Sequence, residues 1–271
     1  MRRSLHYFAL AVACLFALIP IFWMVSTSFK SNREATQDGT ILPASPTLDS
    51  YTGLFTRREF GHYFANALIV TTCAVAIALV IGSLAAYALA RFRLRLGAEK
   101  RLAFVLLIAR MLPTVILIVP IYILTQKLGL LDSRIALILI YAAFDVSLVV
   151  WMMDSFFREI PVDLEEAAMV DGDSRLTAFR RIVLPLAAPG LVATAIFAVI
   201  VTYNEFLFAL LLTSTPDAQT MPVGVATMIG RINIDWGGMA AAGVLGALPI
   251  IIFAMLVQRH LVRGLTLGAV K

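Results

Sequence analysis

Ionisable side chains inside long apolar stretches are the residues of this sequence with the clearest chemical potential: Arg110, Asp145 and Glu205. A charge in an apolar surrounding is costly, so it indicates function by default and needs a partner. Arg110 could face a pathway or an interface, or could form a structural pair with Asp145. Asn204–Glu205 is the best candidate for lining a pathway. Tyr203 could stack on a ring, although aromatic residues in such stretches more often pack.

Several kinds of chemistry lack their sequence patterns. The sequence contains no H-E-x-x-H or G-x-S-x-G pattern and no G-x-x-x-x-G-K-[ST] phosphate loop. His6, His62 and His260 are isolated and show no metal-ligand spacing. Cys14 and Cys73 both fall in apolar segments and are expected to be small buried hydrophobes. We therefore predict no catalytic residue, no metal site and no cofactor bound by this chain.

The charged segment, residues 158–185, stands out between apolar runs. Pro161 and the acids Asp163, Glu165 and Glu166 predict the first turn of a short helix, where negative charge is favoured. Gly172 can adopt a positive φ and predicts the end of that helix. The helix would carry an apolar stripe made of Leu164, Ala167, Ala168 and Val170.

A second short helix is predicted after Gly172. Asp173 or Ser174 could cap its start, and Pro185 is expected to end it. Its apolar residues Leu176, Phe179 and Ile182 recur every three positions, and Arg180 and Arg181 lie in its last turn. The charged segment therefore predicts two helices joined by a hinge.

Composition identifies the broad class of protein. Hydrophobic residues make up 61% of the 271 residues and the mean hydropathy is +0.90, far above ordinary soluble proteins. The sequence is therefore predicted to be a multi-spanning membrane protein. Its pI near 9.5 could suggest nucleic acid, but no basic run is interleaved with aromatic residues. We favour basic residues retained on the cytoplasmic side of a membrane.

Six apolar segments are long enough to cross ~30 Å of hydrocarbon at ~1.5 Å per residue. The first could be a signal peptide, but it is long, contains Pro20 and lacks a small-residue cleavage site, so an uncleaved anchor is favoured. Pro113 and Pro120 interrupt the third, and residues 223–229 could form a re-entrant helix. The six segments are 7–28, 65–90, 102–125, 135–157, 186–212 and 239–257.

The distribution of basic residues predicts the orientation. With the N-terminus inside, fourteen of the 22 Lys and Arg residues fall on the cytoplasmic side and seven fall outside. This bias favours both termini inside and makes the charged segment cytoplasmic. The expected layout is an anchor with an external loop over 1–64, a core over 65–260, and a cytoplasmic tail over 261–271.

The charged segment also resembles a known motif. Its glutamate, two alanines, glycine and final Ile-x-Leu-Pro match the EAA loop of inner-membrane subunits of binding-protein-dependent ABC importers. The resemblance implies that this segment inserts into a groove of a separate ATPase. An ordinary amphipathic loop at the lipid headgroups is the alternative. The matching positions are Glu166, Ala167, Ala168, Gly172, Ile182, Leu184 and Pro185.

The resemblance extends over nearly the whole chain to sugar-importer permeases of the MalG type. It is carried by residues 22–30, 85–91, 204–209 and the tail 261–271. It implies an all-α, type I importer permease fold in a bacterial inner membrane, paired with a second, different permease. Two ATPase subunits carrying ATP and Mg²⁺, and an extracytoplasmic sugar-binding protein, would complete the assembly. In this family the tail reaches into the ATPase dimer interface.

Two departures from the family pattern lie where side chains could line the pathway. Tyr203-Asn204-Glu205 stands where the family usually has Trp-Asn-Glu, and Asp145-Val146-Ser147 stands where Asn-Leu-Pro is common. The transported molecule therefore cannot be carried over from a relative. Residues 215–220 resemble the external loop that enters the binding protein's cleft and displaces the sugar.

Together these features predict a non-enzymatic permease subunit of an ATP-driven carbohydrate importer, coupled to its ATPase through the charged segment. The alternative is an ion-coupled secondary transporter, which would need an essential mid-membrane carboxylate at Asp145 or Glu205. An intramembrane enzyme is disfavoured by the missing motifs. The sequence does not identify the sugar, the partner subunits or the resting conformation.

Overall fold

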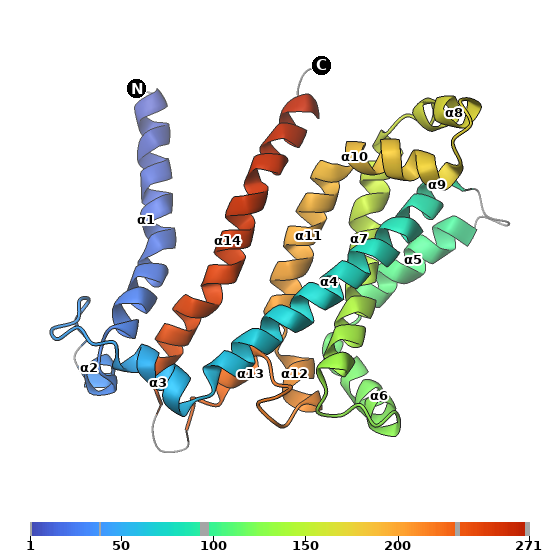
Figure 1. Cartoon of the computed structure of the whole chain (residues 1–271). Helices are drawn as coiled ribbons and strands as arrows, with labels where there is room; N and C mark the ends of the chain where they lie inside the picture. The colour runs from blue at the N-terminus through green and yellow to red at the C-terminus, as the bar shows by residue number, and fades with distance from the viewer. Residues whose placement is uncertain (1, 38, 93–97, 231–233, 269–271) are drawn as a thin grey trace. The chain divides into compact units, whose positions relative to one another are not determined.

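The computed structural model describes residues 2–37, 39–92, 98–230 and 234–268 (Figure 1). Within these ranges the chain forms helices joined by loops and turns, with an isolated bridge between Ile229 and Ile234. The prediction of an all-α membrane protein is confirmed. Two compact units are present, one made of residues 1–65 and 220–249 and the other of 66–219 and 250–271. The end of the predicted tail, residues 269–271, lies outside the described residues.

Among the described residues, four continuous helices are long and apolar enough to cross a membrane: α1 (Arg2–Ser28), α4 (Phe60–Arg91), α7 (Arg134–Glu159) and α14 (Trp236–Gly268). Two bent pairs supply further candidate spans. Helix α5 (Ala98–Met111) meets α6 (Thr114–Lys127) at an angle of 96°, and the helical run that ends at Leu186 meets α11 (Ala188–Tyr203) at 75°. Counting each bent pair as one span gives the six predicted spans.

One predicted span differs from the structure. The fifth span is not continuous over 186–212, because α11 ends at Tyr203 and a separate helix, α12 (Leu207–Leu212), follows. The third span is interrupted as Pro113 indicated, since proline restricts the residue before it and lacks an N–H. The apolar stretch 223–229 overlaps one short helix, α13 (Met221–Ala226), which begins before the stretch and ends within it.

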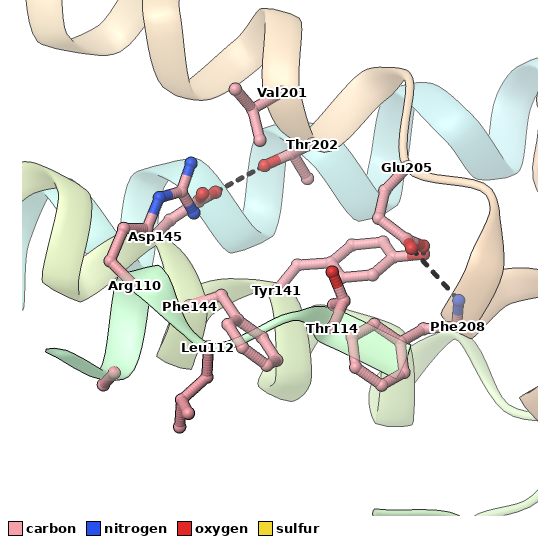
Figure 2. Close-up of a pocket in the computed structure, with 11 residues that line it drawn as sticks. Arg110, Leu112, Thr114, Tyr141, Phe144, Asp145, Val201, Thr202, Glu205 and Phe208 are labelled. Atoms are coloured by element: carbon pink, nitrogen blue, oxygen red, sulfur yellow. Dashed lines mark hydrogen bonds between the residues drawn. The ribbon is translucent and has the colours of Figure 1, made fainter. Parts of the chain in front are cut away.

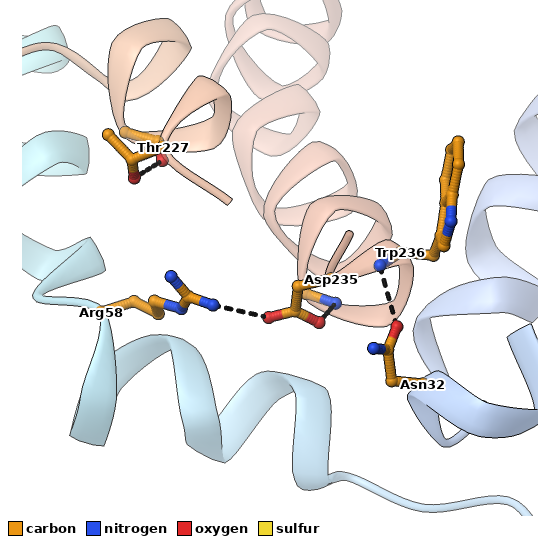
Figure 3. A network of polar contacts seen from close by, with 7 residues as sticks. Asn32, Arg58, Thr227, Asp235 and Trp236 are labelled. Atoms are coloured by element: carbon orange, nitrogen blue, oxygen red, sulfur yellow. Dashed lines mark hydrogen bonds and ion pairs between the residues drawn. The ribbon is translucent and has the colours of Figure 1, made fainter. Parts of the chain in front are cut away.

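In the first unit, a polar network fixes the start of α14 beside α2 (Asn32–Gln37) and α3 (Asp49–Arg57) (Figure 3). The Asn32 side-chain oxygen accepts the Trp236 backbone N–H at 3.0 Å. Asp235 accepts the Gly238 N–H at 2.9 Å and forms an ion pair with Arg58 at 3.5 Å. These contacts supply acceptors to the first turn of a helix, whose N–H groups have no partner within the helix.

In the second unit, short helices lie at both ends of the long ones (Figure 1). Helices α8 (Asp163–Val170), α9 (Arg175–Ala178) and α10 (Leu184–Leu186) lie at one end, and α6 and α12 lie at the other. An aromatic cluster packs the first end: the Tyr87 ring centroid lies 4.6 Å from that of Phe179 and 6.0 Å from that of Phe157. These residues join α4, α7 and the charged segment in one core.

Helices α4 and α7 pack closely because one of them carries a glycine at the crossing. A Cβ atom built on Gly82 would lie 2.6 Å from the Val149 Cβ, which is fully buried. Small residues allow helices in membranes to approach closely, where packing rather than the hydrophobic effect holds them together.

We predict that Gly82→Ala destabilises the protein, by about 1–3 kcal/mol, because the added methyl overpacks this crossing. Gly61→Ala on the same helix is the matched control, since a Cβ there meets no atom within 4 Å. Thermal unfolding of the purified variants in detergent measures both effects. Equal melting temperatures for the two variants would contradict the tight crossing.

Candidate functional site: the charged segment, a polar cavity and an external loop

The charged segment folds largely as its sequence predicts. Helix α8 begins at Asp163 with its acids in the first turn, and Gly172 follows the helix with φ +98°. Ser174, and not Asp173, caps the next helix: its side chain accepts the Thr177 N–H at 3.2 Å. Asp173 instead forms an ion pair with Arg181 at 3.3 Å.

The helical run after Gly172 ends at Leu186, one residue beyond Pro185, but it is not a single regular α-helix. A π-helical turn, η2 (Phe179–Val183), follows α9, and the Leu184 N–H bonds to the Phe179 carbonyl five residues earlier. Pro185 then lies in the first turn of α10, where its missing N–H leaves no helical hydrogen bond broken. The wide turn also breaks the three-residue repeat, so Phe179 and Val183 are buried while Ile182 is half-buried.

A buried ion pair joins the charged segment to α4. The Glu165 carboxylate lies 2.5 Å from the Arg91 Nε and also accepts the Tyr87 hydroxyl at 2.5 Å. The side chains of Glu165 and Arg91 are only 2% and 4% exposed. Arg91 also donates to the Ile160 carbonyl at 2.8 Å, so it contacts both ends of the link between α7 and α8.

From its sequence position Glu165 is predicted only as an acid in the first turn of a helix, and this buried ion pair is not predicted. The sequence of α4 does carry a signal for a buried acid, because Tyr87 and Arg91 are four residues apart and lie on one face of that helix.

A second contact at the same end of α4 supports its connection to the charged segment. Arg158 of α7 donates to the Leu89 carbonyl, one of the last carbonyls of α4, at 3.2 Å. The charged segment is thus held to α4 and α7 by polar contacts as well as by the aromatic cluster.

The predicted coupling residues divide between two surfaces. Ala168 is buried, and Ile182 and Leu184 are half-buried, so these three pack against the spans. Glu166, Ala167, Gly172 and Pro185 are exposed. Apolar side chains accompany the exposed set: Val170 is 87% exposed, and Leu164 and Leu176 about half.

A second site is a cavity of about 310 Å³ between α5, α7, α11 and α12 (Figure 2). Asp145 accepts the Thr202 hydroxyl and interacts electrostatically with Arg110, whose guanidinium lies beside it. Three of the five predicted pathway residues, Arg110, Asp145 and Glu205, therefore line this cavity. The lining residues are Ala109, Arg110, Leu112, Thr114, Tyr141, Phe144, Asp145, Val201, Thr202, Glu205 and Phe208.

The other two predicted pathway residues lie elsewhere. Tyr203 is buried and does not line the cavity, and the exposed Asn204 donates its side-chain amide to the Ile200 carbonyl at 2.8 Å. Asn204 lies at the break between α11 and α12, and its neighbour Glu205 holds that break together.

Glu205 caps helix α12. Its Oε1 accepts the backbone N–H groups of Leu207 at 2.9 Å and Phe208 at 3.1 Å, and its Oε2 accepts the Tyr141 hydroxyl. Because N–H groups in an apolar surrounding need partners, this carboxylate makes the interruption of the span possible. The sequence indicated an unusual acid here but not this structural use.

The predicted external segment, residues 213–220, is fixed at two points. Asp132, with φ +57°, accepts the backbone N–H groups of Ser214 at 2.8 Å and Thr215 at 3.0 Å. Asn66 donates to the carbonyls of Pro216 and Gln219, both at 2.9 Å. Burial raises the pKa of the Asp132 carboxyl, but the hydrogen bonds from Ser214 and Thr215 outweigh it and hold this pKa below its usual range.

We predict that Glu165→Gln lowers stability by about 3 kcal/mol, because it leaves the Arg91 charge buried without a counter-charge. The double variant Glu165→Gln/Arg91→Met should recover part of this loss, which a double-mutant cycle measures. Arg181→Ala is the control. The Arg181 side chain is 72% exposed, so its ion pair with Asp173 contributes little to stability. Strictly additive losses in the cycle would contradict a direct interaction.

The Asp132 contacts predict a pH-dependent effect. Because the folded pKa is lowered, the ionised carboxylate contributes stability above the unfolded pKa of about 4, and this contribution is lost as the pH falls through the folded pKa. Asp132→Asn should therefore lower the melting temperature at pH 7, and the gap to wild type should narrow below about pH 4. A gap of constant size across that range would rule out this contribution.

The chain is similar to known transport proteins. A family model described as "Binding-protein-dependent transport system inner membrane component" matches residues 78–267. The chain is 38% identical to the trehalose transport system permease protein SugB of Mycobacterium tuberculosis, covering 100% of this chain and 98% of that protein. It is 37% identical to the trehalose/maltose transport system permease protein MalG of Thermococcus litoralis, covering 97% and 93%.

A solved structure shares the fold. It is a bacterial ABC transporter involved in the import of the acidic polysaccharide alginate, and one of its chains matches with a TM-score of 0.79 and 24% sequence identity. The match covers 94% of this chain and 95% of that one. The fold is therefore that of a type I importer permease.

Proposed function

Because the chain belongs to the family of binding-protein-dependent transport system inner-membrane components, we propose that it is the permease subunit of an ATP-driven carbohydrate importer. It is a multi-pass protein of the inner membrane, and members of its family work with a binding protein and an ATPase. The carbohydrate assignment rests on relatives named for trehalose and maltose transport. Its substrate would be a small carbohydrate of this kind.

The charged segment is the observation that carries the proposal. Its inner face is fixed to α4 and α7 through Glu165, Ala168 and Phe179, whereas Val170 and Glu166 face outward. An exposed apolar side chain next to acidic groups suits a helix that docks in a groove with basic surroundings. We infer that the ATPase binds this outer face, and that the ATPase itself binds ATP and Mg²⁺.

The remaining partners follow from the same proposal. A second, different permease would complete the pathway, two ATPase subunits would bind inside, and an extracytoplasmic binding protein would deliver the sugar. The external segment 213–220 would meet that binding protein, and its fixation by Asp132 and Asn66 suits an element that must hold its shape while it displaces a ligand. Non-enzymatic function of this chain belongs to the same proposal.

The contacts indicate how force would pass through this subunit. Closure of the ATPases would push on α8, and the Glu165–Arg91 pair would transmit this displacement to α4. The secondary-transporter alternative is not favoured, because the relatives are permeases of binding-protein-dependent systems. Glu205, one of the two carboxylates that could serve such a transporter, accepts backbone N–H groups of α12 and so has a structural use.

The proposal is tested by purifying the chain with its partners and measuring uptake. A tagged chain is isolated in mild detergent, and its co-purifying proteins are identified by mass spectrometry. The complex is then reconstituted into proteoliposomes that enclose ATP, with the binding protein and radiolabelled carbohydrates outside. Uptake that requires both ATP and the binding protein supports the proposal. Uptake by the chain alone, driven by an ion gradient, would overturn it.

We predict that Val170→Asp prevents co-purification of the ATPase and abolishes uptake, because it places a charge on the apolar part of the docking face. The variant should keep the wild-type melting temperature, since Val170 is 87% exposed. Val170→Ile is the matched control and should retain both activities. Normal ATPase binding by Val170→Asp would show that docking occurs elsewhere.

A further inference from the structure

The cavity between α5, α7 and α11 contains polar groups that the fold leaves available. The Glu205 carboxylate is occupied by α12 and Tyr141, and one Asp145 oxygen accepts the Thr202 hydroxyl. The Arg110 guanidinium makes no hydrogen bond to another described residue, although five N–H donors lie beside the Asp145 carboxylate (Figure 2). The cavity therefore presents adjacent donors and acceptors that remain for a ligand.

The lining favours a neutral polyhydroxyl compound over an ion. Two carboxylates and one guanidinium line the cavity, so an anion would meet excess negative charge and a cation would approach Arg110. Neighbouring hydroxyl groups suit the Arg110–Asp145 pair, because each hydroxyl can accept from the guanidinium and donate to the carboxylate. The Phe144 ring, 5.4 Å from that of Phe208, adds an apolar surface for the C–H face of a sugar ring.

The size of the cavity is compatible with this ligand. Its volume of about 310 Å³ lies at the lower end of the range for small-molecule pockets, ~300–1,000 Å³. The cavity lies beside two helix breaks: α5 ends before Pro113 and α11 ends before Glu205. Irregular backbone at membrane depth is tolerated where it lines a cavity, so both breaks are consistent with a pathway at this point.

We propose that this subunit itself binds the transported carbohydrate, with Arg110 and Asp145 holding adjacent hydroxyl groups and Phe144 packing on the ring. This inference rests on the proposed importer function and adds a substrate site within this chain. Tyr203 and Asn204, which lie off the cavity, take no part in it. Glu205 acts on the site only by keeping the break at the end of α11 in place.

The test measures carbohydrate imported per ATP hydrolysed by the reconstituted complex, at saturating sugar-loaded binding protein. The probes are glucose, trehalose and maltose, and the wild-type complex identifies the one that is imported. The variants are Asp145→Asn, Arg110→Gln and Phe144→Leu. Because Phe144→Leu changes no charge, its complex should still assemble if the two charge-removing variants prevent assembly. Loss of a substrate hydrogen bond should lower the sugar-to-ATP ratio roughly tenfold while ATP hydrolysis continues.

The matched control is Asp154→Asn, on the same helix α7 but outside the cavity, where the aspartate pairs with the half-exposed Arg158. It should keep the wild-type ratio. A merely structural role for the cavity residues would lower transport and ATP hydrolysis together, leave the ratio unchanged and overturn the site. If the wild-type complex imports none of the three sugars, the importer proposal itself fails for this substrate class, and the site fails with it.

Discussion

The carboxylate of Glu165, buried between Arg91 and Tyr87, is the interaction on which the arrangement of the charged segment depends. A charge withdrawn from water is stable only where opposite charge and hydrogen bonds surround it, so this carboxylate has few alternative positions. Helix α8 is consequently fixed to the end of α4. The aromatic cluster and the Arg158–Leu89 contact fix the neighbouring parts of the same end. A displacement of α8 would therefore be passed on to the spans instead of being lost in a flexible loop.

The same requirement, that polar groups find partners in an apolar surrounding, explains the break in the fifth span. Helix α11 ends at Tyr203, and the first N–H groups of α12 would lack acceptors without the Glu205 carboxylate. The break is therefore stabilised by a charged side chain. It is not caused by a helix-breaking residue, because no glycine or proline lies at positions 203–206. Thr202, near the end of α11, and Asp145 of α7 lie in the wall of the cavity, which Glu205 also lines. The structural acid and the proposed ligand site therefore share one cavity.

Local chemistry was readable from the sequence, and contacts between distant segments were not. Gly172 marks the end of α8 because its positive φ favours glycine, and the apolar segments gave the spans and their bent pair at Pro113. The π-helical turn at Phe179 was missed, and its first residue packs against Tyr87 of the distant helix α4. Glu165 and Glu166 are adjacent in sequence, and nothing in their local pattern shows which one is buried. The pairing of Asp145 with Thr202 likewise required the crossing of α7 and α11.

We propose that an ATPase acts on this subunit through the outer face of the charged segment. Placing a photo-crosslinking amino acid at Val170, which is 87% exposed, tests it directly in membranes that contain the whole complex. We predict a crosslink to a nucleotide-binding subunit, identified by mass spectrometry, and none from the same amino acid at Leu48, which is 60% exposed and directly precedes α3. Crosslinks from Val170 to lipid alone would contradict the account.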